Sequence, residues 1–173
     1  MTDDDKTNSS EETRMELSAN AEALKNAWQS TLTEMDSLAE EYESDGWKTT
    51  TVPTGHTAPE SEESGETDRW GLVFTVPNNY GKKIKTILAK GDFPEYDVYR
   101  KHATQRVFLV VVYLDSASEQ ALLVAGSYQT TYADDLIERT KKEGEVYSYL
   151  RTINGTQLAT FRHRTPEKFF PKV

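Results

Sequence analysis

The sequence predicts an α+β protein with a mixed, mainly antiparallel sheet of about six to seven strands, a long N-terminal helix and two shorter helices packed chiefly on one face. Three features indicate this fold. Apolar residues follow a helical repeat between Leu17 and Tyr42, residues 106–114 (RVFLVVVYL) form a nearly unbroken apolar run, and Asn154-Gly155 marks a β-hairpin. Strands occur in groups separated by single helices, which favours antiparallel pairing over strict strand–helix repeats.

Length and composition predict one domain. A chain of 173 residues can bury one substantial core. Residues 1–13 are acidic and nearly free of apolar side chains, so we expect a disordered acidic tail followed by a single α+β domain at 14–173. The N-terminus lacks the basic and apolar pattern of a signal peptide, and no run reaches the roughly 18 apolar residues of a membrane span. We therefore expect a cytoplasmic protein.

The first helix is predicted at residues 14–44. Thr13 and Glu16 match a capping box, and Gly46 matches the residue that ends a helix. The stripe could form a coiled-coil seam or a partner-binding face, but Thr31 interrupts the heptad register, which favours a helix laid across a sheet. The apolar stripe consists of Leu17, Ala21, Leu24, Trp28, Leu32, Met35, Leu38 and Tyr42.

The remaining elements follow from strand and helix patterns. Residues 106–114 read as a central strand covered on both faces, because they are apolar and rich in β-branched side chains. Helices are predicted at 78–90 and 131–143. The other predicted strands span 47–52, 70–76, 95–101, 121–128, 146–153 and 156–163.

The last two strands are joined by the strongest hairpin signal in the chain. Asn154-Gly155 predicts a type I′ turn, which needs positive φ at both central residues. If Ile153 lies opposite Thr156, the register places two sets of side chains on opposite faces. One face carries Val146, Ser148, Leu150, Ala159, Phe161 and His163, and the other carries Tyr147, Tyr149, Arg151, Leu158 and Arg162.

The charge of the chain is unevenly distributed. The net charge is −9, with 18 acidic and five basic residues in 1–81 but 11 acidic and 15 basic residues in 82–173. The basic C-terminal hairpin mixes aromatic and cationic side chains, as single-strand nucleic-acid platforms do. The net charge and the lack of a nucleic-acid-binding motif disfavour that function, and the hairpin could instead bind an acidic protein or pair its cations internally. The candidate partner-binding residues are Tyr147, Tyr149, Arg151, Arg162 and Arg164.

Motifs for catalysis or cofactor binding are missing from the sequence. No cysteine is present, the three histidines are 46 and 61 residues apart, and no P-loop, dinucleotide-binding or G-x-S-x-G pattern occurs. We therefore expect no cofactor and no metal. The long segment 53–69 reads as a surface loop, where function often resides. The candidate catalytic residues are His56, Glu66, Asp68, Arg69 and His102. They would line a pocket beside the strand that carries Tyr96 and Tyr99.

Three functions are consistent with these features. The first is a non-enzymatic protein-binding or regulatory module, which fits the ordinary core and the divided charge. The second is a small-ligand binder or hydrolase-type enzyme with a pocket near the 53–69 loop. The third is nucleic-acid binding through the C-terminal hairpin.

Several strings of the sequence also point to a family. They are AEALK at 21–25, DGW at 45–47, TAPE at 57–60, TDRWGLVFTVPNN at 67–79, EYDVYR at 95–100, RVFLV at 106–110 and LLVAGSY at 122–128. With these strings, the chain from Met15 to Pro171 resembles an uncharacterised family of haloarchaeal proteins. No activity is assigned to that family, so the resemblance transfers no functional residue. It implies a high-salt cytoplasm, which agrees with the acidic N-terminal half, although 12 Lys against eight Arg departs from the usual pattern of such hosts.

Overall fold

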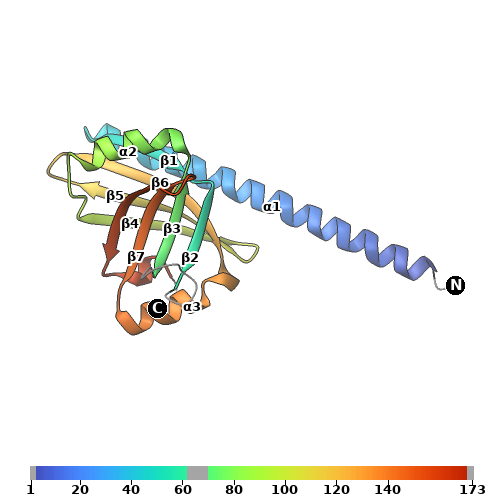
Figure 1. Ribbon diagram of the computed structural model, residues 1–173. Helices are drawn as coiled ribbons and strands as arrows, with labels where there is room; N and C mark the ends of the chain where they lie inside the picture. The colour runs from blue at the N-terminus through green and yellow to red at the C-terminus, as the bar shows by residue number, and fades with distance from the viewer. Residues whose placement is uncertain (1–2, 62–69, 171–173) are drawn as a thin grey trace.

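Two four-stranded mixed sheets packed face to face form the body of the protein. The computed structural model describes residues 3–61 and 70–170, and it contains α1 (Asp3–Ser44), α2 (Gly81–Leu88) and α3 (Asp134–Glu143) beside the sheets. Figure 1 shows α1 along sheet A, with α2 and α3 at opposite ends of the sandwich. Sheet A has the order β1 (Lys48–Pro53), β6 (Gln120–Gln129), β5 (Arg106–Asp115) and β4 (Glu95–Ala103). Sheet B has the order β2 (His56–Glu60), β3 (Gly71–Val76), β7 (Val146–Thr152) and β8 (Gln157–His163), and 3₁₀ turns occupy η1 (Asn78–Tyr80), η2 (Thr130–Tyr132) and η3 (Pro166–Lys168).

The predicted single sheet with helices chiefly on one face is wrong. The described residues form eight strands in two sheets, and only α1 lies flat on a sheet face, because α2 and α3 lie at the ends. The extra strand is β2, which falls in the segment predicted as a loop. Pro59 lowered the strand signal of this segment, but β2 is an edge strand, the position in a sheet where proline is tolerated.

Strand β5 is the doubly covered central strand that the sequence predicts. Its Leu109 and Val111 face sheet B, whereas Val110 and Val112 face α1. The antiparallel β5–β6 pair is also as predicted. Each sheet additionally contains one parallel pair, β1 with β6 and β3 with β7, which makes both sheets mixed.

The C-terminal half of α1 covers the outer face of sheet A. Met35, Leu38 and Ala39 are buried there, so the prediction of a helix laid across a sheet is confirmed for this half. The predicted helix start at residue 14 is wrong, because α1 begins at Asp3, and Thr13 donates its hydroxyl to the carbonyl of Ser9 inside the helix instead of capping it. No proline or glycine interrupts residues 3–44, so nothing in the backbone stops the helix at that point.

The β7–β8 hairpin has the predicted register but a different turn. Val146 pairs with His163 and Leu150 with Ala159, and the register then shifts between Leu150 and Arg151. Gly155 has a φ of 90°, but Asn154 does not belong to the described non-glycine residues with positive φ. A type I′ turn, which needs positive φ at both positions, is therefore excluded. The turn therefore consists of an ordinary first half and a left-handed glycine, a geometry that accompanies a β-bulge.

The C-terminal segment closes the side of the sandwich between the edge strands β4 and β8. Phe169 and Phe170 are fully buried in the core between the sheets. The Tyr128 hydroxyl donates to the carbonyl of Phe169 at 3.2 Å, which fixes the segment against β6. Residues 164–170 therefore belong to the fold and are not a free tail.

A buried polar chain links the two sheets. The Tyr113 hydroxyl of sheet A lies 2.7 Å from Ser148 Oγ of sheet B, and Ser148 Oγ lies 2.7 Å from Nε2 of His163. Burial lowers the pKa of His163 to about 3, so its imidazole is neutral near pH 7. Its Nδ1 has no hydrogen-bond partner among the described residues.

The close contact between β3 and β7 predicts that Gly71→Ala is strongly destabilising. A Cβ at Gly71 would lie 2.1 Å from the backbone oxygen of Tyr147, which cannot move without breaking the sheet. We expect a loss of about 3 kcal/mol in the free energy of unfolding, measured by urea denaturation. The control is Gly55→Ala, where a Cβ meets no atom within 4 Å. Equal stability of the two variants would contradict this packing.

The buried imidazole predicts that stability falls in acid. The pKa of His163 in the folded state, about 3, lies below its ordinary value of 6.5, so the unfolded chain binds the proton more readily. The stabilisation by neutral His163 is complete above pH 6.5 and declines between pH 6.5 and 3, by roughly 1.4 kcal/mol per pH unit at most. Denaturation curves across this range should show a steeper pH dependence for the native chain than for His163→Gln. The exposed His102→Gln variant should retain the native slope.

Candidate functional site

A cleft of about 680 Å³ opens between β2 and the start of α3. It arises from the path of the chain. Strand β1 pairs with β6 only as far as Ala125 and then leaves sheet A at Pro53 to begin β2 in sheet B. Strand β6 continues to Gln129, beyond the end of its pairing with β1. Gln129 therefore borders the cleft.

Titratable and charged side chains from three elements line this cleft. His56 comes from β2 and Arg106 from the first position of β5, while Asp134 and Asp135 form the first turn of α3. Carboxylates are favourable at that end of a helix because the helix dipole is positive there. Ala58, Pro59 and Leu136 supply apolar wall area.

A local network holds these elements together. The backbone N–H and the hydroxyl of Thr130 both donate to the carbonyl of Gln105, at 2.9 Å and 3.0 Å. This contact fixes the β4–β5 turn, and therefore Arg106, relative to η2 and the start of α3. Thr104 and Gln105 have φ of 51° and 61°, an arrangement typical of a type I′ turn, the geometry predicted at Asn154-Gly155.

The charged groups of the cleft are not paired with one another. Within residues 3–61 and 70–170, the side chains of His56, Arg106, Asp134 and Asp135 make no hydrogen bond or ion pair. Arg106 is nevertheless half-buried, whereas both aspartates are exposed. The cleft therefore presents unpaired charge of both signs to whatever enters it.

The structure brings only part of the predicted catalytic cluster to one place. His56 lines the cleft, and His102 lines an adjoining cavity of about 330 Å³ that shares Asp134 with it. Glu66, Asp68 and Arg69 lie outside the described residues. Tyr96 contacts the C-terminal segment and Tyr99 packs against the core under α1, so neither borders the cleft.

Sequence reasoning missed three of the charged cleft residues. Arg106 looked like the start of a buried strand, and Asp134 and Asp135 looked like ordinary residues of a helix start. The predicted helix start at residue 131 is also wrong, because residues 130–132 form η2 and α3 begins at Asp134. The only available signal was the presence of charged residues at the ends of a strand and a helix. Whether such ends lie close together depends on the topology, which the sequence pattern does not specify.

The predicted partner-binding hairpin uses its aromatic side chains within the molecule. Tyr147 and Tyr149 stack with ring centres 6.2 Å apart, and Trp70 meets Tyr147 edge-on at 4.7 Å. The guanidinium of Arg139 lies 4.6 Å from the centre of the Trp70 ring. The aromatic face of the hairpin thus joins α3 to sheet B.

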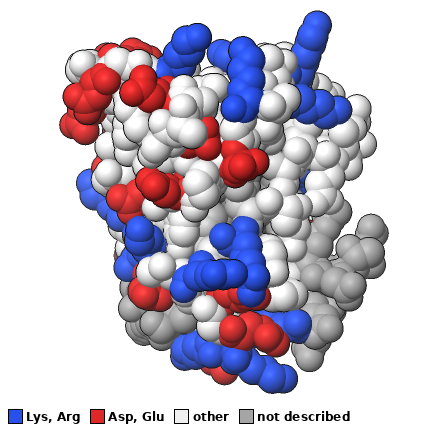
Figure 2. Space-filling view, turned by 90° about the vertical axis from the view of Figure 1, so that its left-hand side faces the viewer, with Lys and Arg blue, Asp and Glu red and all other residues white. Residues whose placement is uncertain are grey.

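The cations of the same hairpin are partly neutralised. Arg162 pairs with Glu145, and this carboxylate raises the pKa of the guanidinium above its ordinary value. Arg151 donates its Nε hydrogen to the hydroxyl of Thr75 at 3.4 Å, while Arg164 is exposed. On the face in Figure 2, Lys and Arg lie among Asp and Glu, so this face carries no unbroken basic surface.

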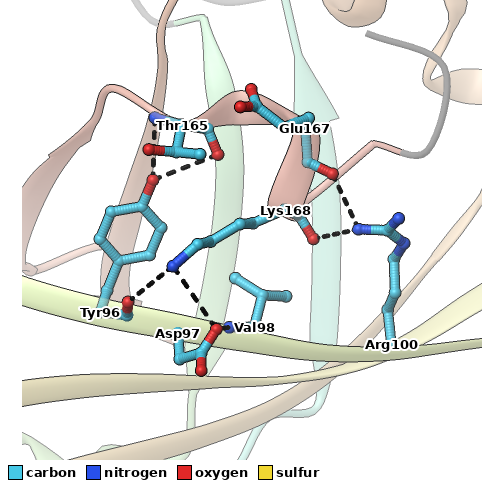
Figure 3. Close-up of polar contacts among 7 residues, drawn as sticks. All are labelled: Tyr96, Asp97, Val98, Arg100, Thr165, Glu167 and Lys168. Carbon is cyan, nitrogen blue, oxygen red and sulfur yellow. Dashed lines mark hydrogen bonds and ion pairs between the residues drawn. The ribbon is translucent and has the colours of Figure 1, made fainter.

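Basic residues near the C-terminus hold the chain end against β4. Figure 3 shows Tyr96, whose hydroxyl accepts from Thr165 N–H at 3.0 Å and donates to the Thr165 carbonyl at 3.2 Å. Arg100 donates to the carbonyls of Glu167 and Lys168, and Lys168 lies 3.6 Å from Asp97. These contacts give Arg100 and Lys168 a structural role within the fold.

The N-terminal half of α1 stands apart from the sandwich. Figure 1 shows it projecting well beyond the sheets. Residues 8–23 are exposed, including Met15 at 72% and Leu17 at 66% of full exposure, and the first half-buried apolar residue is Leu24. We call residues 8–27 the arm. Its positions Leu17, Ala21 and Leu24 continue the apolar stripe that is buried further along the helix.

Two further properties concern the part of the chain that the structure describes. None of its helices has an apolar stretch long enough to span a bilayer. No group of three or more His, Asp or Glu side chains converges there in a way that could hold a metal ion.

Comparison with known proteins identifies a family and nothing more specific. The chain matches none of the curated proteins and none of the solved structures with which it was compared. Residues 14–171 match a family of unknown function, DUF7529. Since this match covers nearly the whole chain, including both sheets and most of α1, the protein belongs to that family.

Proposed function

We propose that the chain is a protein-binding module and that the arm, residues 8–27 of α1, is its docking element. One observation supports this proposal above all others: residues 8–23 are helical and exposed, although their apolar stripe continues the one that packs on sheet A. A surface helix normally buries such a stripe. The exposed Leu17 side chain would stabilise a complex by about 1.5–3 kcal/mol if it were fully buried by a partner.

The composition of the arm supports the same function. Ser9, Ser10, Thr13, Ser18 and Asn20 are weak helix formers, and the exposed part of α1 gains nothing from tertiary packing. A partner that covers Leu17 and Leu24 would supply the packing that this half of the helix lacks. The arm ends beside the half-buried Trp28, so a bound helix could extend from the arm to the edge of sheet A.

The acidic N-terminal half supports a halophilic archaeon as the source and its high-salt cytoplasm as the location. In molar salt the screening length falls to about 3 Å, so ion pairs at a surface contribute little to binding. Burial of an apolar stripe does not depend on charge. An arm that docks through leucine and alanine side chains therefore suits such a cytoplasm better than one that docks through the basic hairpin.

Of the two other functions, ligand binding or hydrolysis has some support from the structure, whereas nucleic-acid binding has none. A small-ligand binder or hydrolase-type enzyme is favoured by the cleft beside β2 and His56. Nucleic-acid binding is disfavoured by the net charge of −9 and by the internal contacts of Arg162 and Lys168.

The proposal predicts that Leu17→Glu reduces capture of the partner by at least about tenfold, because a charge would replace an apolar contact. The matched control is Met15→Glu. Met15 is as exposed as Leu17, but two residues correspond to about 200° around a helix, so it lies on the opposite side. The measurement is quantitative recovery of copurified protein from cells in which the chain is native, at molar salt.

Two further measurements complete this test. Both variants should keep the thermal midpoint of the native chain, because both side chains are exposed. Sedimentation of the purified chain shows whether the partner is a second copy. Equal recovery of the same partner by the native chain, Leu17→Glu and Met15→Glu would rule out the arm as the docking element.

A further inference from the structure

The charges that line the cleft between β2 and α3 define a second binding site, independent of the arm. We infer that this cleft binds a small zwitterion, such as a free amino acid or a dipeptide, with its carboxylate on Arg106 and its ammonium group on Asp134 and Asp135. The volume of about 680 Å³ is that of a small-molecule pocket, for which roughly 300–1,000 Å³ is usual.

Arg106 is the group that most needs a ligand. Arg106 is half-buried, and its side chain has no partner in the part of the chain that the structure describes. An arginine in the wall of a cleft that has no internal anion beside it can pair with an anion of a ligand. A guanidinium presents paired N–H donors in a plane, and a carboxylate accepts two of them at once.

The position of Arg106 is also well fixed. It is the first residue of β5, it pairs with Gln129 of β6, and it follows Gln105, whose carbonyl is held by Thr130. Because the backbone that carries the binding group is already ordered, only the side chain of Arg106 loses conformational entropy when a ligand binds. The alternative explanation is that Arg106 is a surface arginine that only keeps the end of β5 soluble. That role does not account for its place in the wall of a cleft.

Asp134 and Asp135 restrict the class of ligand. The dipole of α3 explains why acidic residues occur at this end of the helix, so their presence alone indicates no site. Their place in the same cleft as Arg106 is what matters. A simple anion would gain from Arg106 but be repelled by two carboxylates, and a simple cation would leave Arg106 unpaired. A molecule with both charges satisfies both walls.

The uncharged lining selects an apolar body for that molecule. Ala58, Pro59 and Leu136 line the cleft together with the charged groups. An aliphatic side chain can cover this area, and each buried methylene group strengthens binding. L-Leucine and the dipeptide L-alanyl-L-leucine are therefore suitable probes.

The test uses titration calorimetry on the full chain, at a salt concentration at which circular dichroism shows it to be folded. L-Leucine and L-alanyl-L-leucine are compared with two analogues that each carry one charge: 4-methylpentanoate lacks the amino group and 3-methylbutylamine lacks the carboxylate. We expect at least one zwitterion to bind at least tenfold more tightly than either analogue. The inference is overturned if neither zwitterion shows saturable binding, or if an analogue binds as tightly as the better zwitterion.

Variants locate the site. Arg106→Gln and the double variant Asp134→Asn with Asp135→Asn should each weaken zwitterion binding at least tenfold. The matched controls Lys101→Gln and Glu95→Gln change exposed charges on β4, away from the cleft, and should bind like the native chain. Undiminished binding by folded Arg106→Gln overturns the inference. If that variant fails to fold, the aspartate pair and the analogue series still decide the question, and none of these results depends on the arm.

Discussion

The structure depends above all on the burial of β5 and β6 between two apolar layers. Val110 and Leu123 meet α1 on one side, and Leu109 and Val124 meet sheet B on the other. Removing these side chains from water is the dominant favourable contribution to the fold. Strand β5 lies inside sheet A, where β4 and β6 pair with its two edges and β1 pairs with β6.

The same burial explains where the free surfaces lie. Only the C-terminal half of α1 finds apolar side chains to cover on sheet A, so the helix is held firmly there and the arm leaves the body. Elsewhere in the fold, β1 leaves β6 after Pro53, and the chain continues into β2 of sheet B. Gly126 permits that crossing, because a Cβ there would lie 2.4 Å from Thr57 Oγ1 and 2.7 Å from Phe74. The cleft is the space beyond this crossing.

The prediction of the fold succeeded where the pattern was local. The apolar repeat of the long helix, the alternation in β7 and β8, and the apolar run of β5 each depend on neighbours in sequence, and the structure has all three. Of the predicted catalytic residues, only His56 lies at the cleft, and it comes from the segment that the sequence singled out as a loop. Arg106 and Asp134 are 28 residues apart and carry no shared motif, so no local pattern could bring them together.

The sequence by itself determined the helical stripe, the central strand, the hairpin register and the lack of thiol chemistry, since these follow from side-chain periodicity and composition. Only the tertiary structure decided that the strands divide into two sheets, that residues 8–23 of α1 are exposed, and that charges of both signs, unpaired within the described residues, share one cleft. The physical reason is that periodicity specifies which face of an element is apolar but not which other element buries it. That choice depends on packing between residues distant in sequence, such as Thr57 against Gly126.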